Sequence, residues 1–245
     1  MVVVCQQPNY FAWLGYLEQC ARSDVLILLD SVQWIKQGRQ HRTRILAHTQ
    51  EHQEKLYHWL TLPVLGRAHR TKTFCELEID RNQAWAKWHW NSLKTVYGKR
   101  PFFKSQLKPI VQPWFEKNAF EKNLFDVTAS SLKLCLETLG LKPEIIRSSN
   151  LDKDSTKTDR LVSLCKAVNG DVYYSGLAST KYIEASKFRA SEIELIWQHW
   201  KHPDYDQGRF RFQSHLSFLD VLANVPVETV RKWLQPRPWG PPQIR

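Results

Sequence analysis

The segment that most constrains the fold lies at residues 2–30. Val2–Gln6 is a short apolar run of strand type, residues 13–22 carry apolar side chains at helical spacing, and Val25–Leu29 is a second apolar run that ends at Asp30. Strand, helix and strand within about 30 residues predict a βαβ unit, which joins parallel strands by a right-handed crossover. The same alternation predicts a helix and three further strands, over residues 155–168 and over 144–147, 172–174 and 192–197.

These patterns predict the α/β class: an open, mostly parallel sheet flanked by helices, with Rossmann-like topology. Between the two halves we expect helical and hairpin insertions, at residues 44–64 (hairpin), 81–97, 101–118 and 123–139. No linker composition divides the chain. We therefore expect one α/β domain over residues 1–235 and an extended, proline-rich arm over residues 236–245.

The composition favours an anionic partner. Thirty-five Lys and Arg against 24 Asp and Glu give a formal net charge of +11, which suits nucleotides, phosphorylated sugars and other anions. The charge does not form one continuous stripe, so general nucleic-acid binding is not favoured, although tRNA stays open as an aminoacyl donor. The sequence contains no apolar run of about 18 residues, so no membrane-spanning helix is expected. The sequence does not set the oligomeric state.

The cysteines indicate a reducing compartment. Their number, five, is odd, and no two of them are close in the sequence. This pattern argues against a disulfide framework and against a cysteine-type zinc site, so we expect a cytoplasmic protein. The pattern HTQEH at residues 48–52 matches an inverted zinc-protease motif, but its polar surroundings offer no face that could bury a metal. We predict no metal site, and the cofactor stays unknown.

Polar residues follow the first two predicted strands. Gln7 and Asn9 come after the first strand, and Asp30 ends the second. Ligands of open α/β sheets bind beyond the carboxyl ends of the strands, so we expect Asn9 and Asp30 in one pocket. Asn9 and Gln7 would orient a reacting carbonyl or phosphoryl group, and Asp30 is the candidate base. The alternative is that Pro8 and Asn9 form only a turn.

Two basic clusters are candidates for anion binding. Lys157, Thr158 and Arg160 open a predicted helix, where cations are disfavoured by the helix dipole unless an anion is bound. The basic residues of 39–44 follow the second strand and could close over a ligand. Either cluster could instead be an exposed, solvated surface. The full set of expected substrate- and anion-binding residues is Gln6, Trp13, Gln40, Arg42, Arg44, Ser148, Ser149, Lys157, Thr158, Arg160, Ser175 and Gly176.

Other patterns carry less weight. Cys5 is typical of a buried strand cysteine, and His89 of a histidine packed within a helix. The pair His202-Pro203 is a weaker candidate for the site. The sequence contains no GxxxxGK[ST], GxGxxG or GxSxG pattern, so phosphate-loop, typical dinucleotide and serine-hydrolase sites lack support.

Several runs resemble the WbqC-like family: QQPNYFAWLGY at 6–16, WLTLPV at 59–64, the segment 148–176 and LSFLDVLAN at 216–224. The frequent histidine of that family is Gln6 here, and the frequent proline is Ala12. An amide does not titrate near neutral pH, so Gln6 cannot act as a general base. Members occur among genes for O-antigen and related polysaccharides, and the resemblance implies an aminoacyl (glycine) transferase.

We therefore expect a transferase that moves an acyl or aminoacyl group from an activated donor to an amine or hydroxyl, in surface-polysaccharide or small-molecule biosynthesis. Two alternatives stay open. One is a nucleotidylyltransferase-like enzyme, which the first motif faintly resembles. The other is a non-catalytic protein that binds a nucleotide or a sugar phosphate.

Overall fold

A computed structural model describes residues 1–34, 38–47, 56–66, 72–151, 155–209 and 211–236. Its centre is a five-stranded sheet, in which every pair of neighbouring strands is parallel and the order is β5-β2-β1-β6-β7. The strands are β1 (Val2–Gln6), β2 (Val25–Leu28), β5 (Glu144–Arg147), β6 (Val172–Ser175) and β7 (Glu194–Trp197). The predicted α/β fold is confirmed; its Rossmann-like detail stays a prediction.

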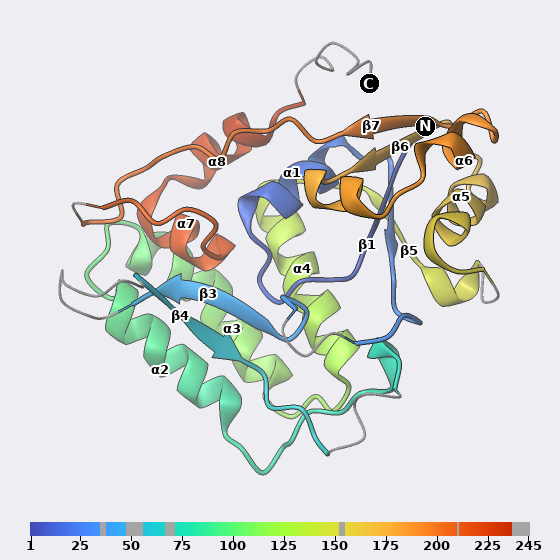
Figure 1. Cartoon of the computed structure of the whole chain (residues 1–245). Coiled ribbons are helices and arrows are strands. Elements are labelled where there is room, and N and C mark those ends of the chain that lie inside the picture. The colour runs from blue at the N-terminus through green and yellow to red at the C-terminus, as the bar shows by residue number, and fades with distance from the viewer. Residues whose placement is uncertain (35–37, 48–55, 67–71, 152–154, 210, 237–245) are drawn as a thin grey trace.

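Both faces of the central strands are buried, which explains why they read as continuous apolar runs. Val4 and Leu26 face one core, whereas Val3 and Ile27 face the other. The first core is covered by α1 (Leu14–Arg22), α4 (Leu124–Leu139) and α8 (Val227–Leu234), and the second by α5 (Lys157–Ala167) and α6 (Ala185–Arg189). Figure 1 shows these two groups of helices on opposite sides of the sheet.

The chain between β2 and β5 forms the expected insertions. An antiparallel hairpin joins β3 (Arg42–Leu46) to β4 (Tyr57–Thr61), with Arg44 paired to Trp59. The helices that follow are α2 (Trp85–Tyr97) and α3 (Lys108–Asn118), and they lie beside the hairpin in Figure 1. The remaining helical elements are η2 (Phe74–Glu76), η3 (Phe103–Leu107), η4 (Ser148–Asn150), η5 (Leu177–Lys181) and α7 (Phe218–Asn224).

The strand order reverses at β1, and this reversal locates the place where a ligand is expected. β2 and β5 lie on one side of β1, while β6 and β7 lie on the other. Open α/β sheets bind ligands at such a switch point, beyond the carboxyl ends of the strands. The candidate region is therefore the end of β1, at Gln6, together with the end of β6, at Ser175-Gly176.

Some expectations concern residues outside the described ranges. Residues 48–52, at which no zinc is expected, lie outside the described ranges. Residues 237–245 of the expected proline-rich arm lie outside them too. None of the helices that the structure describes is long and apolar enough to cross a membrane.

Candidate functional site

The loop between β1 and α1 is held in a strained conformation. Phe11 has a φ of 41°, a left-handed value that is costly for a bulky residue. Its N–H donates to the Oγ of Ser131 at 3.1 Å, and its carbonyl accepts from the hydroxyls of Thr43 at 3.1 Å and Ser217 at 2.9 Å. Partners from α4, from β3 and from the start of α7 thus fix the turn. Strained backbone of this kind concentrates at functional sites.

The polar side chains of this loop lie where the sequence predicted, at the end of β1. Gln6, Gln7 and Asn9 are each half-buried. The side-chain amide of Gln40 donates to the Oε1 of Gln7, which ties the loop to the segment that leads into β3. The Oε1 of Gln40 is buried and accepts no hydrogen bond from any residue that the structure describes. A buried polar atom without a partner is rare in proteins and is often explained by a missing ligand or water.

Three arginines, two on the hairpin and one in the segment that leads into it, stack on aromatic rings. Arg42 and Arg44 alternate with residues that point into the core, and Arg42 Cζ lies 4.2 Å from the ring centre of Trp59. Arg44 Cζ lies 4.2 Å from the ring centre of Tyr57 and 4.8 Å from that of Trp59, and Arg39 lies 5.7 Å from Trp59. We call these five residues the arginine face. Stacking on a ring holds a guanidinium in one orientation and leaves its in-plane N–H groups available.

Two members of the arginine face, Arg39 and Arg44, have no counter-charge among the described carboxylates. Burial, together with the charges of Arg44 and Arg42, lowers the pKa of Arg39 to about 10. In the described part of the chain, neither Arg39 nor Arg44 forms an ion pair with a carboxylate, and Arg44 Nε is buried without a hydrogen-bond partner. An anion bound here would relieve the repulsion and satisfy that donor.

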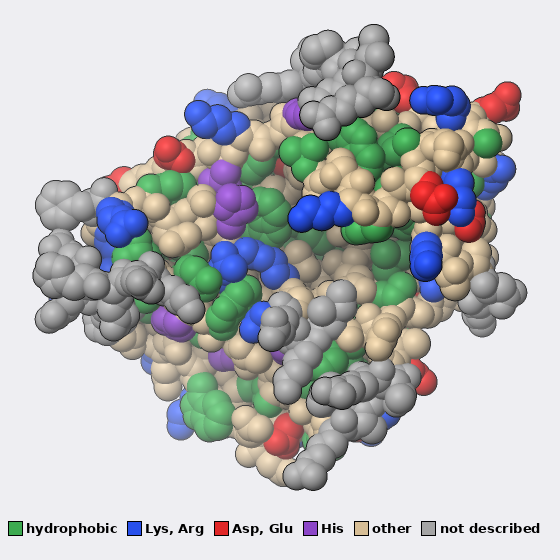
Figure 2. All heavy atoms as spheres, viewed as in Figure 1, with side chains coloured by type: hydrophobic (Ala, Val, Ile, Leu, Met, Phe, Trp, Pro, Cys, Tyr) green, Lys and Arg blue, Asp and Glu red, His purple; other side chains and the backbone are tan. Residues whose placement is uncertain are grey.

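Two histidines lie next to the arginine face. Arg39 donates to the backbone carbonyl of His215, whose ring packs 4.9 Å from Trp13 and 5.5 Å from the ring of His202. Figure 2 shows Lys or Arg side chains and histidines near a hollow on this face of the molecule. Trp13, a predicted binding residue, therefore lines the same area as the arginine face.

His202 has a defined tautomer. Its Nδ1 lies 2.8 Å from the carbonyl oxygen of Pro203, and because a carbonyl only accepts, Nδ1 must carry the proton. The other ring nitrogen, Nε2, then has a free lone pair, and it is buried without a hydrogen-bond partner among the described residues. Burial is the main cause that lowers the pKa of His202 below its usual 6.5, so the ring is neutral at neutral pH. A neutral imidazole with one fixed N–H has the form of a proton acceptor.

Ser175 and Gly176, at the end of β6, contribute backbone rather than reactive side chains. Ser175 is buried, and its carbonyl accepts from the N–H of Gln198 at 2.7 Å. A Cβ on Gly176 would lie 3.1 Å from the amide nitrogen of Gln19. Gly176 therefore lets the side chain of Gln19 approach the backbone at the switch point.

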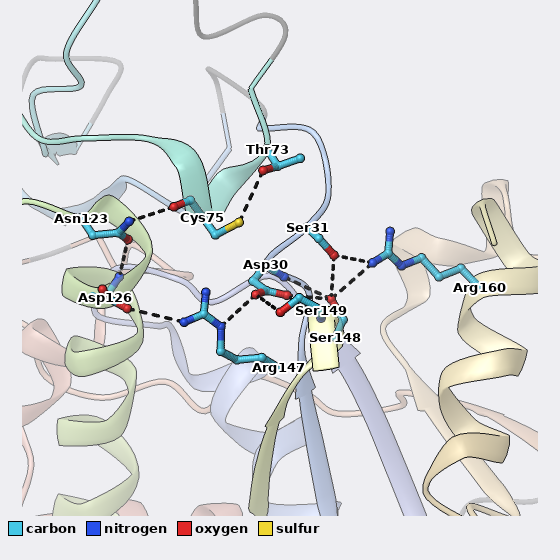
Figure 3. Close-up of polar contacts among 10 residues, drawn as sticks. All are labelled: Asp30, Ser31, Thr73, Cys75, Asn123, Asp126, Arg147, Ser148, Ser149 and Arg160. Atoms are coloured by element: carbon cyan, nitrogen blue, oxygen red, sulfur yellow. Dashed lines mark hydrogen bonds and ion pairs between the residues drawn. The ribbon is translucent and has the colours of Figure 1, made fainter. Parts of the chain in front are cut away.

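Asp30 lies at the end of β2 in a different environment from the one expected of a base (Figure 3). Its fully buried carboxylate accepts from Arg147 Nε at 2.8 Å, from Ser148 Oγ at 2.9 Å, and from the N–H and Oγ of Ser149 at 2.9 and 2.7 Å. Desolvation alone would raise the pKa of Asp30, but the hydrogen bonds from Ser149, Arg147 and Ser148 outweigh it and lower the pKa. These contacts favour an ionised anchor between β2 and β5. The pocket shared with Asn9 stays a prediction.

Arg160 belongs to the surroundings of Asp30. Figure 3 shows it reaching from α5 toward the strand ends, where it donates to Ser31 Oγ at 2.6 Å and Ser148 Oγ at 3.4 Å. Three of the predicted binding residues, Ser148, Ser149 and Arg160, thus gather around Asp30 and hold one another. Their contacts describe an internal network more closely than an open anion site.

Lys157 and Thr158 do not join Arg160 in one cluster. Thr158 is only 1% exposed, and its hydroxyl accepts from the N–H of Glu184 at 3.2 Å and lies 3.5 Å from the carbonyl of Tyr182. Lys157 is exposed and has a φ of 53°. The first turn of α5 therefore directs its side chains to different places, and a common anion site for them stays a prediction.

The sequence analysis missed several residues of the candidate site. Tyr57, Trp59 and His215 were not singled out, although RTR at 42–44 opposite YHW at 57–59 has the alternation of a basic-aromatic hairpin face. The described residues contain no group of three or more histidine, cysteine or carboxylate side chains placed to hold a metal.

Comparison with known proteins adds one finding. A model described as the WbqC-like protein family matches residues 7–232, a range that includes the loop after β1, the arginine face and His202. No curated protein and no solved structure gives a significant match.

Proposed function

The chain belongs to the WbqC-like protein family, and we propose that it is a transferase for an acyl or aminoacyl group. It takes this group from an activated, anionic donor and passes it to an amine or hydroxyl, in surface-polysaccharide or small-molecule biosynthesis. The observation that carries the proposal is the arginine face, a positive surface joined through Gln40 and Gln7 to the switch point of the sheet. Within it, Arg39 and Arg44 form no ion pair with a described carboxylate.

The arginine face would bind the anionic part of the donor. Guanidinium groups match the oxygens of a phosphate or carboxylate in pairs, and each such charged hydrogen bond contributes roughly 1.5–3 kcal/mol. Because Trp59 and Tyr57 hold Arg42 and Arg44 in place, little reorganisation is needed when negative charge develops on the leaving group.

The transfer step uses groups on both sides of this region. The nitrogen or oxygen of the acceptor attacks the acyl carbon, a new C–N or C–O bond forms, and the bond from that carbon to the donor breaks. The leaving group keeps the electron pair, which the arginine face stabilises, and the proton of the nucleophile moves to Nε2 of His202. Asn9 and Gln7 orient the acyl carbonyl. Asp30 keeps β2 and β5 aligned and takes no proton.

A thermal-shift titration tests the anion site. The wild type is titrated with inorganic phosphate, pyrophosphate, nucleoside mono-, di- and triphosphates, and acetyl phosphate. We expect stabilisation by at least one of them, and an affinity about tenfold or more lower in Arg44→Ala, since one decade corresponds to about 1.4 kcal/mol. Arg189→Ala is the matched control, because it removes the same charge from an exposed position on α6.

Two results would contradict the anion site: no response of the wild type to any of these anions, or an equal loss of affinity in Arg189→Ala. Turnover is followed separately, as consumption of an acyl donor in the presence of an amine. Stabilisation by the donor without consumption would favour the alternative of a non-catalytic protein that binds a nucleotide or a sugar phosphate.

A further inference from the structure

A buried carboxylate controls a chain of amides that leads to the switch point. Glu18, on α1, is 2% exposed. It is paired with Arg22, and it accepts from the hydroxyl of Tyr174 at 3.0 Å and from Nε2 of Gln198 at 2.7 Å. A carboxylate in an ion pair only accepts hydrogen bonds. Gln198 must therefore turn its NH₂ group toward Glu18.

The orientation of Gln198 sets that of the next two amides. With its nitrogen directed to Glu18 and to the carbonyl of Gly15 at 2.7 Å, Gln198 offers its oxygen to Gln19 Nε2, at 3.0 Å. Gln19 then offers its own oxygen to Gln6 Nε2, at 2.9 Å. Reversing any one amide would place two oxygens or two NH₂ groups against each other. The assignment of each oxygen and nitrogen thus follows from the charge of Glu18.

At the end of this chain stands Gln6, the last residue of β1. Its nitrogen is committed to Gln19, so its carboxamide oxygen is the free end of the chain, and no described residue donates a hydrogen bond to it. Gln6 is half-buried and precedes Gln7 and Asn9 at the switch point. The site therefore presents an acceptor of fixed polarity, which does not change with pH because an amide does not titrate near neutrality.

We propose that Gln6 Oε1 binds an N–H or O–H of the acceptor substrate, and that the Glu18–Gln198–Gln19 chain is the device that positions it. The proposal deepens the transferase function and rests on it for the identity of the ligand as the nucleophile. Held by one hydrogen, an amine or alcohol keeps a lone pair free to attack the acyl carbon. A carboxylate or a tertiary amide has no hydrogen to offer and is not accepted at this point.

The test compares two neutral amides: acetamide, which has two N–H groups, and N,N-dimethylacetamide, in which methyl groups replace both hydrogens. Each is titrated into isotope-labelled protein, and the side-chain resonances of Gln6 are followed by NMR. We expect acetamide to shift them at concentrations at least threefold lower than N,N-dimethylacetamide. In the wild type, the Gln6 NH₂ should also exchange with solvent more slowly than the NH₂ of Gln235, an exposed glutamine at the end of α8.

Two variants at position 6 separate polarity from shape. Gln6→His retains it, because one ring N–H can donate to Gln19 while the other nitrogen accepts, so the preference for acetamide should survive, read from the backbone resonances around residue 6. Gln6→Met has similar length but neither donor nor acceptor, and the preference should vanish. Gln235→Met is the control substitution and should change nothing.

Equal response to the two probes, or a Gln6 NH₂ that exchanges as fast as that of Gln235, would overturn the proposal. Both results come from the wild type, so they count even if a variant fails to fold. The outcome is independent of the anion site, since both probes are uncharged. If the wild type binds no anion but both wild type and Arg44→Ala still prefer acetamide, the proposed function is contradicted and the acceptor role of Gln6 Oε1 remains. If the wild type binds an anion but shows no preference for acetamide, the anion site remains and the role of Gln6 is contradicted.

Discussion

Replacing Asp30 by asparagine separates the two roles that this carboxylate could have. A general base can be exchanged for its amide with loss of activity and little loss of stability. An anchor cannot, because the new NH₂ group would meet donors from Arg147, Ser148 and Ser149 in a fully buried place. The contacts described above favour the anchor, so we expect Asp30→Asn to be strongly destabilised.

The expected loss follows from the contacts. Four hydrogen bonds reach the carboxylate of Asp30, one of them from a guanidinium. Breaking a buried ion pair costs about 3–5 kcal/mol, but the side chain of Arg147 is 43% exposed and can be hydrated again. The serine hydroxyls can also rotate. We therefore expect the free energy of unfolding to fall by about 2–4 kcal/mol, which lowers the melting temperature by roughly 5–15 °C.

The pH dependence gives the sign. The folded-state pKa of Asp30 is lowered below the ordinary 3.8, so the stabilisation from its charge is complete above pH 3.8 and is lost as the pH falls through the folded-state value. Urea unfolding at several pH values measures the difference between wild type and Asp30→Asn, which should shrink in acid. Asp126→Asn is the control, since Asp126 lies 3.9 Å from the same Arg147 but is 53% exposed. It should cost less than about 0.5 kcal/mol. A normally stable Asp30→Asn would refute the anchor.

Three further outcomes are expected. NMR of the histidine ring nitrogens should find His202 in the Nδ1–H form at neutral pH, with a pKa below 6.5; an Nε2–H form would exclude it as the proton acceptor. A maleimide should label Cys75 alone in the folded protein, read by intact mass, because burial raises the pKa of the other four thiols, those of Cys5, Cys20, Cys135 and Cys165. Thr158→Val should lower the free energy of unfolding by about 1–2 kcal/mol through the lost bond to Glu184, whereas Lys157→Ala should leave it within about 0.5 kcal/mol.

The sequence predicted the sheet well because its central strands are buried on both faces. Val2–Gln6 was predicted with the observed bounds, and β2 ends one residue before the predicted end. β7 begins at Glu194 rather than at residue 192, because Glu192 has a φ of 57° and belongs to a turn. Contiguous apolar runs report burial directly, whereas turn geometry depends on neighbours that the local sequence does not contain.

The candidate site was predictable only in part. Gln7 and Asn9 follow the end of β1, and Asp30 follows the end of β2, as the strand pattern indicated. The pocket expected to join Asn9 and Asp30 stays a prediction. The partners of Asp30 come from the end of β5 and from η4, 117 to 119 residues away, so no local pattern could show that its carboxylate is already satisfied. The sequence identified residues 39–44 only as a basic cluster, because Tyr57 and Trp59, whose rings hold the arginines, lie on the opposite strand of the hairpin.

The order of the strands also has a consequence for how the chain acquires its structure. β1 is synthesised before the other strands of the sheet, yet it lies in the middle of the sheet. Its second neighbour, β6, begins only at Val172. β5, the outer neighbour of β2, follows a long insertion. During synthesis, one edge of β1 therefore stays unpaired until β6 has left the ribosome. Long-range parallel pairing of this kind folds slowly and is exposed to aggregation. A slowing of translation before residue 172 is reached, or chaperone binding at that stage, should therefore change the soluble yield more than a translation delay after β7.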